Sequence, residues 1–355
     1  MKKLLKILGV VAVCATLFCY GCMSSSSAID EVLIEKLDGV PMGRDYITYV
    51  PNDILVDTSY FYMFGANMNH YCYVSDITGN GQDYEILKIG RGPNEYISPR
   101  LLHKTHDNLL YIYNEATREL RCNQLIKEND SLKIQTISSY MATGGNMMPN
   151  TEMIMLDNGY VVGMPFMGRD SLFALYSYQM EYLGTFGKLP IEWEKKGDVN
   201  LYAPFAGKLS SSGNRLFYAA HNIPYVACYE ISDNGSVKLC WEKFYGSAEA
   251  YIENNSIKFT NSSKKSFMDV EVGYDFIYLT YCGHSISELA HDPMLAYDSD
   301  LVVINYDGNI CGRYETNYPL SNITISEDQK YLYTVCSVDD RIDIVSFKLP
   351  NVSER

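Results

Sequence analysis

Short strand-like segments recur in sets of four along the chain, beginning near residue 54. Within a segment apolar and polar residues alternate, and Gly, Asn or Asp separates it from the next. The first set reads "ILVDT", "YFYMF", "HYCYVSD" and "YEILKIG". The first sets end about 49 residues apart, and later intervals lengthen by insertion. Four antiparallel strands per repeat at this period are typical of a β-propeller.

Six sets fit into the chain, so we expect an all-β fold: a six-bladed β-propeller with four antiparallel strands per blade. A single domain would cover residues 31–355. The sixth set, "NITISED", "KYLYTVC" and "RIDIVSF", lacks its fourth strand. We expect an N-terminal segment, either "EVLIEKL" or "DYITYV", to supply that strand and close the ring, which removes a free sheet edge. A β-sandwich or a pair of smaller β domains is the alternative.

The chain begins with an export-type leader. Three lysines precede an apolar run over residues 7–20, which is shorter than the roughly 20 residues that span a bilayer. The leader, residues 1–21, resembles a bacterial lipoprotein signal ending at Gly21–Cys22, although Cys19 replaces the usual aliphatic residue. The resemblance implies a lipidated Cys22, a flexible tether over residues 22–30 and anchoring in the cell envelope, most simply at the outer membrane. A plain secretory signal is the alternative.

Charge and cysteine spacing exclude some classes of protein. The chain has 29 Lys and Arg against 43 Asp and Glu, a formal net charge of −14, so nucleic acid is not an expected partner. The cysteines after Cys22 include no C-x-x-C pair, which argues against a metal–thiolate framework. Cys228 and Cys240 are equidistant from Asn234 in the turn "SDNGS". A disulfide between them stays open, because a register change of one residue would separate them.

The segment "GRGPNEY" invites comparison with a phosphate-binding loop. Such a loop opens a helix and presents backbone N–H groups, whereas Pro93 removes a donor and no helical pattern follows. We therefore predict a crossing from blade one to blade two. Gly90 and Gly92 would adopt backbone conformations that other residues avoid, Pro93 would stiffen the turn, and Tyr96 would pack between blades.

This segment resembles the TolB-like six-bladed propeller lipoproteins of Gram-negative bacteria, in which it reads close to G-x-G-P-G-E-[YF]. Asn94 replaces a glycine, and the matching residues are Gly90, Gly92, Pro93, Glu95 and Tyr96. The resemblance implies a propeller fold and an envelope location. It implies no reaction, because most members have no assigned activity.

Loop length predicts which face binds. In a four-stranded blade, the second-to-third connection and the crossing to the next blade share one face, here called the long-loop face. The longest connections, residues 140–152, 188–201, 244–265 and 282–298, belong to it, and such loops commonly carry binding sites. The opposite face is called the short-turn face. The candidate ligand-binding residues are Arg91, Glu95, Arg169, Asp170, His221, Asn222, His284, His291 and Arg341, and no catalytic residue is assigned.

Two weaker readings involve a metal ion. His284 and His291 are seven residues apart and have acidic neighbours, so a helix there could hold a metal. A divalent cation such as calcium could also occupy the central channel, with Asn261, Asp269 and Glu271 as weak candidate ligands. No other cofactor is expected.

Three functions remain open. The first is a non-catalytic binding or scaffold protein for a protein partner or glycan, acting as a monomer that meets the membrane only through its lipid. The second is a metal-dependent enzyme of the lactonase, lyase or hydrolase type. The third is a structural member of a lipoprotein complex. The sequence has no G-x-S-x-G, H-E-x-x-H or P-loop motif, which favours the first.

Overall fold

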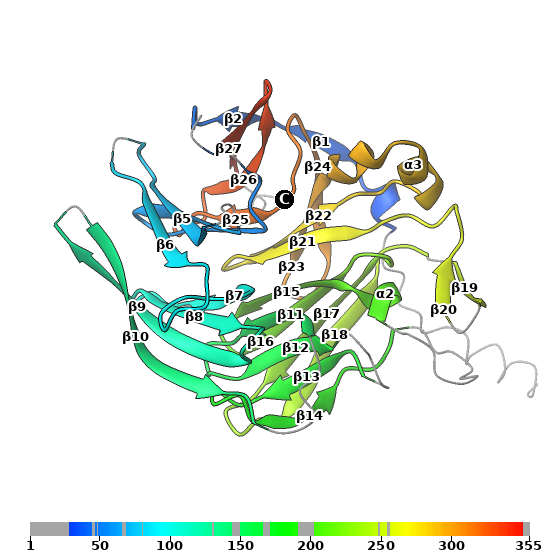
Figure 1. Ribbon diagram of the computed structural model, residues 1–355. Helices are drawn as coiled ribbons and strands as arrows, with labels where there is room; N and C mark the ends of the chain where they lie inside the picture. Colours follow the sequence, from blue (N-terminus) through cyan, green and yellow to red (C-terminus); the bar gives the residue numbers. More distant parts are fainter. Residues whose placement is uncertain are drawn as a thin grey trace, which may run out of the picture.

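The computed structural model describes residues 28–44, 47, 49–65, 69–79, 81–129, 131–143, 150–165, 171–190, 202–247, 249–253 and 256–350. The predicted fold is confirmed: small antiparallel sheets follow one another around a centre as a six-bladed β-propeller (Figure 1). Blade one consists of β3 (Asp53–Val56), β4 (Tyr60–Phe64), β5 (His70–Asp76) and β6 (Tyr84–Lys88); blade two of β7 (Pro99–Lys104), β8 (Leu109–Asn114), β9 (Glu119–Glu128) and β10 (Ser131–Met141). Blade three consists of β11 (Asn150–Met155), β12 (Val161–Pro165), β13 (Phe173–Tyr176) and β14 (Tyr182–Phe186); blade four of β15 (Gly207–Ser212), β16 (Arg215–Ala220), β17 (Tyr225–Ile231) and β18 (Val237–Phe244).

The N-terminal part of the chain completes the last two blades. Blade five contains β21 (Phe267–Val272), β22 (Phe276–Tyr281), β23 (Asp300–Asn305) and β24 (Ile310–Thr316), and β1 (Ile34–Leu37) adds to β24 in parallel. Blade six contains β25 (Ile323–Ile325), β26 (Tyr331–Val338) and β27 (Arg341–Lys348), with β2 (Gly39–Pro41) antiparallel to β27 as its outer strand.

The outer strand itself is residues 39–41, between the two segments expected to supply it, and of those two segments only the second touches β27. Residues 34–37 extend blade five, and Ile47 makes only an isolated bridge to Ile342. The physical reason lies on β27, where the carboxylate of Asp343 accepts hydrogen bonds from the backbone N–H groups of Gly43 and Arg44 at 2.8 and 2.7 Å. These bonds hold the chain that follows β2 against β27.

Aromatic side chains fill the space between blades. The ring of Phe173 in blade three meets Tyr218 and Tyr229 of blade four edge-on, with centroids 5.3 and 5.5 Å apart. Phe61 of blade one meets Tyr333 of blade six in the same way at 4.9 Å. Such rings bury large areas and favour edge-to-face geometry, so they pack the blades to one another.

The segment from Gly90 to Tyr96 crosses from β6 to β7. Tyr96 is 2% exposed, and its hydroxyl donates to Asn123 Oδ1 of blade two at 2.8 Å. Gly90 and Gly92 do not adopt the left-handed backbone that we expected. Glycine is needed here because Glu95 approaches the backbone closely. Its Oε2 accepts a hydrogen bond from the Gly92 N–H at 2.7 Å. A Cβ on Gly90 would lie only 2.1 Å from that oxygen.

Two insertions on the long-loop face form what we call the crown: the hairpin of β19 (Ala250–Glu253) and β20 (Ser256–Phe259), and α3 (Ile286–His291) with the 3₁₀ turn η2 (Pro293–Tyr297) (Figure 1). Ser285 caps α3 in a reciprocal capping box with Glu288. The Ser287 N–H donates to the Asn261 carbonyl at 3.0 Å, which joins the two insertions. A further short helix, α2 (Tyr202–Phe205), precedes blade four.

The docked part of the chain begins before residue 31. The turn η1 (Ile29–Glu31) buries Ile29 to 1% exposure, and the Ile29 N–H donates to the Tyr245 carbonyl at 2.8 Å. Residues 29 and 30, which were expected to belong to a tether over residues 22–30, are therefore part of a turn docked on the propeller. The leader and Cys22 lie outside the described residues, and among those described no helix is long and apolar enough to cross a membrane.

Cys228 and Cys240 are free thiols. The register around "SDNGS" pairs Ile231 with Val237, as the symmetric turn predicts, but it shifts between Cys228 and Tyr229. Trp241 therefore stands opposite Cys228, and Cys240 occupies the bulge.

Candidate functional site: the mouth of the central channel

Charged side chains near the start of the inner strands define what we call the channel mouth. Its residues are Asp53 on β3, Arg100 on β7, Glu152 on β11, Lys208 on β15 and Asp269 on β21. The inner strands start at the long-loop face, so the channel mouth opens there.

Ion pairs connect the channel mouth from blade to blade. Arg100 Nη1 lies 3.4 Å from Glu152 Oε2, and Lys208 Nζ lies 3.8 Å from Glu152 Oε1. Asp269 Oδ2 accepts from the Ile323 N–H of blade six at 2.8 Å. Asp53 interacts electrostatically with both Arg100 and Lys208. Acidic and basic groups thus alternate around most of the ring and compensate one another.

Burial in the channel shifts the pKa values of these groups. Removal from water raises the pKa of Asp53 and of Glu152, and the opposing pull of Lys208 only partly offsets this effect. Burial raises the pKa of Asp269 to about 7 and that of Glu271, two residues further along β21, to about 8. Asp53 and Asp269 add like charge near Glu271. This end of the channel therefore holds carboxyl groups that retain protons near neutral pH.

His221 and Asn222, both candidates from the sequence, lie beside the channel mouth in the connection from β16 to β17. His221 Nδ1 lies 2.6 Å from the Phe267 carbonyl at the start of β21. Burial lowers the pKa of His221 to about 4, and Lys208 and Lys265 add to this effect, so the ring is neutral at physiological pH. The Lys265 ammonium donates to Asn222 Oδ1 at 2.5 Å.

The structure does not bring the other candidates to the channel mouth. Arg91 and Glu95 belong to the blade crossing, and Arg341 begins β27 after the second-to-third connection of blade six. His284 precedes α3 and lies 3.6 Å from Asp298, so it does not share a helix face with His291. Arg169 and Asp170 lie outside the described residues.

Neither of the two candidate metal sites is assembled among the residues that the structure describes. His291 Nδ1 lies 2.7 Å from the Ser287 carbonyl on its own helix. Asn261 bonds to α3 in the crown rather than facing the channel, which corrects its place among the channel candidates. Among the described residues, no group of three or more His, Cys, Asp or Glu side chains is arranged to hold a metal ion.

Sequence reasoning missed Asp53, Arg100, Glu152 and Lys208. The available signal was their position: each is one of the first three residues of an inner strand, in "NDILV", "PRLLH", "TEMIM" and "GKLSS".

The crown beside the channel mouth exposes large apolar side chains. Met294 is 69% exposed, Tyr297 51% and Tyr251 46%. Single exposed hydrophobic residues are common, but Met and Tyr together on neighbouring insertions are typical of protein-binding surfaces.

Comparisons with known proteins place the fold only. No protein-family model matches the chain, and no curated protein matches it. Among solved structures, an exported protein from Bacteroides fragilis NCTC 9343 is similar at 11% identity with a TM-score of 0.58, over 90% of this chain and 97% of that one. A luciferin-regenerating enzyme is similar at 8% identity with a TM-score of 0.50, over 88% and 96%. A protein described as a 6-phosphogluconolactonase, from Bacteroides uniformis ATCC 8492, has 14% identity and a TM-score of 0.41 over 83% and 79%, too low to support an argument.

Proposed function

We propose that this protein is an exported, lipid-anchored propeller of the cell envelope that binds a protein partner without catalysis through its long-loop face. The observation that carries this proposal is the exposed apolar set on the crown, Tyr251, Met294 and Tyr297, next to a channel mouth of compensated charges. An apolar centre with a mixed-charge border is the usual composition of a protein-binding surface. A glycan is the alternative ligand of the same face.

The leader supports export and anchoring, and the segment from Gly90 to Tyr96 supports membership of the TolB-like propeller lipoproteins. A Cys22→Ala variant tests the anchor. We expect the wild-type protein in the outer-membrane fraction and the variant in soluble fractions. Equal membrane association of both would contradict lipidation at Cys22.

The binding face is tested with a photo-crosslinking amino acid at Tyr297 in living cells. Tyr331, 39% exposed at the start of β26 on the short-turn face, is the control position. We expect a discrete protein adduct from position 297 and none from 331. A Met294→Ser substitution added to the position-297 protein should weaken that adduct. Equal adducts at both positions, or glycan-array binding without any adduct, would overturn a protein partner.

A second candidate is a cation-dependent enzyme that uses the channel. Burial raises the pKa values of Asp269 and Glu271, and Asp53 raises both further, as Asp269 does that of Glu271; this favours the candidate, since a cation among these carboxyl groups would relieve their repulsion. Calorimetric titration with calcium tests it. Saturable binding that Asp269→Asn abolishes would support this candidate, and absence of binding heat would remove its basis.

A further inference from the structure

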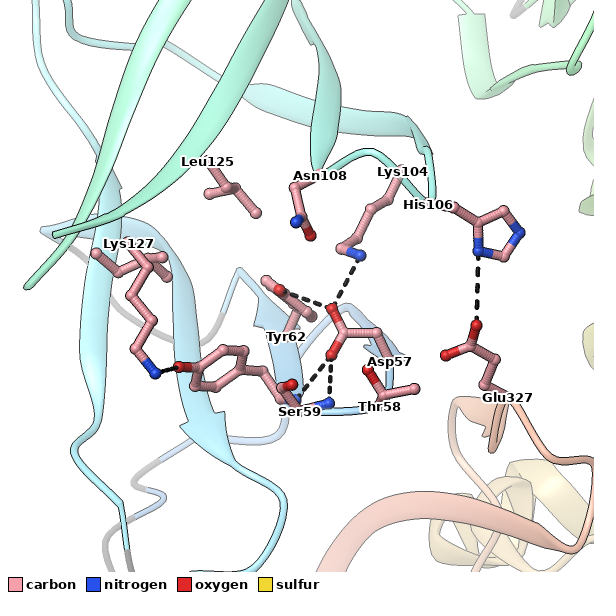
Figure 2. A pocket seen from close by; sticks show the side chains of 12 residues that line it. Asp57, Thr58, Ser59, Tyr62, Lys104, His106, Asn108, Leu125, Lys127 and Glu327 are labelled. Carbon is pink, nitrogen blue, oxygen red and sulfur yellow. Dashed lines mark hydrogen bonds and ion pairs between the residues drawn. The ribbon is translucent and has the colours of Figure 1, made fainter.

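Figure 2 shows a pocket of the propeller from close by. Its volume is about 350 Å³, and the turns that line it place it on the short-turn face, opposite the channel mouth. Its walls come from the turn after β3, the turn after β7 and the adjoining ends of β9 and β10. This volume is within the range of small-molecule sites. The pocket shares no residue with the crown or the channel mouth, so its role is independent of the proposed function.

Asp57 is a fixed part of the wall. Its Oδ1 accepts from the backbone N–H groups of Ser59 and Tyr60, both at 2.8 Å. Its Oδ2 meets the Tyr62 hydroxyl and the Lys104 ammonium, both at 2.9 Å (Figure 2). Although burial opposes ionisation, these bonds lower the pKa of Asp57. The carboxylate is therefore ionised and fully engaged, and its effect is to position Lys104.

Lys104 is a buried cation at the pocket. Its side chain is only 6% exposed, and its Nζ also lies 5.1 Å from the centre of the Tyr62 ring. An ammonium has three N–H donors, and Asp57 takes one of them. Among the described residues, Asp57 and the Tyr62 ring are the contacts that hold the Lys104 ammonium at the pocket, and its other N–H groups can donate to a ligand.

Lys127 supplies a second cation, with which the Asp76 carboxylate interacts electrostatically. Its Nζ donates to the Tyr60 hydroxyl at 2.6 Å and lies 5.3 Å from the centre of that ring. In the part of the chain that the structure describes, no carboxylate forms an ion pair with Lys127. On a chain with a net charge of −14, the Lys127 ammonium is a local site for an anion.

The rest of the pocket suits a small ring with hydroxyl groups. Leu125 and Leu132 provide an apolar wall, and Figure 2 shows Leu125, Asn108 and Lys104 along one side of the space. At the rim, His106 of blade two lies 3.7 Å from Glu327 of blade six. The pocket therefore offers apolar contact to one face of a ring and hydrogen-bond donors and acceptors to the hydroxyl groups of that ring.

We infer that this pocket binds an anionic monosaccharide, either a sugar acid or a sugar phosphate. The carboxylate or phosphate pairs with Lys127, the apolar face of the ring lies on Leu125 and Leu132, and hydroxyls bond to Lys104 and Asn108.

Calorimetric titration of the purified full chain tests the inference with glucuronate, glucose 6-phosphate, glucose and inorganic phosphate as separate probes. We expect saturable binding of glucuronate or glucose 6-phosphate, and which of them binds identifies the anion. Glucose lacks the anion and inorganic phosphate lacks the ring, so both should bind at least about tenfold more weakly.

Lys127→Gln is the decisive variant because this exposed side chain can change without disturbing the core. It should weaken binding at least about tenfold, since the charge-assisted contact is lost. Lys133→Gln is the matched control, because Lys133 is exposed on neighbouring β10 and pairs with Glu128; it should change affinity less than about twofold. The inference is overturned if neither anionic sugar binds, if inorganic phosphate binds as tightly as the sugar, or if Lys127→Gln leaves affinity unchanged.

Discussion

The side-chain carboxylate of Asp269 accepts a 2.8 Å hydrogen bond from the backbone N–H of Ile323, which joins the inner strands of blades five and six. Its other oxygen accepts from the Val270 N–H at 2.9 Å. The same carboxyl group belongs to the channel mouth, where burial raises its pKa to about 7. One side chain therefore connects the architecture of the ring with the electrostatics of its channel.

Asp343→Ala is expected to lower the free energy of unfolding by about 2–4 kcal/mol, because the substitution leaves backbone N–H groups of the closing segment without an acceptor. The backbone N–H groups of Gly43 and Arg44 are among those that lose their acceptor. Urea unfolding measures the change. Asp233→Ala, in an exposed turn, is the control and should stay within about 0.5 kcal/mol of wild type. A similarly small effect at Asp343 would mean that these bonds do not hold the closing segment.

Glu271→Gln is expected to flatten the pH dependence of stability between about pH 5 and pH 8. Burial raises the pKa of Glu271 from 4.5 to about 8, so in this window the folded state keeps a proton that the unfolded state releases. Stability therefore falls as the pH rises, by up to about 1.4 kcal/mol per pH unit for this group. Asp53, Asp269 and Thr324, which also act on Glu271, are unchanged in the variant.

Urea unfolding across this pH range, with the exposed Glu181→Gln as a control, measures the slope. Parallel profiles for wild type and Glu271→Gln would show that Glu271 does not retain its proton.

Lys208→Met is expected to destabilise the fold by about 3–5 kcal/mol near pH 8, because it removes one of the two cations that compensate the buried acids of the channel mouth. Glu152, Asp269 and Asp53 all interact with this lysine. The loss should shrink toward pH 5, where Asp269, whose pKa burial raises to about 7, takes up a proton. Lys238→Met, at an exposed position on β18, should cost less than about 0.5 kcal/mol. A loss that is the same at both pH values would argue against charge compensation.

Gly90→Ala is expected to cost about 1–3 kcal/mol, since the new Cβ would displace the Glu95 carboxylate from the Gly92 N–H. The Glu95→Ala substitution removes both the carboxylate that a Cβ on residue 90 would meet and the hydrogen bond from the Gly92 N–H. The double variant should therefore be more stable than the sum of the single losses predicts, by about 1 kcal/mol or more. Strict additivity would show that the glycine is needed for something other than the approach of Glu95.

The blades were predictable because each strand carries its own local signal. Alternation in "HYCYVSD" and turns such as "SDNGS" needed no distant information. The outer strand of blade six was not predictable, because "GVP" has no strand pattern and its position depends on Asp343, about 300 residues away. The channel mouth was only partly predictable. Asp269 stood out as an acid on an inner strand, but Lys208 gains its role only from neighbours that the ring assembles.

The docked turn at Ile29 also limits how the molecule can stand on a membrane. Tyr245, which receives the Ile29 N–H, follows β18 on the long-loop face. Six peptide units separate Cys22 from Ala28, and a segment of this length can span about 20 Å when fully extended. A lipid on Cys22 would therefore tilt the propeller with the channel mouth toward the bilayer, and the pocket at Lys127 would point away from it. Partners of the long-loop face would then be proteins embedded in or lying on that membrane, while ligands of the short-turn face would arrive from the aqueous side.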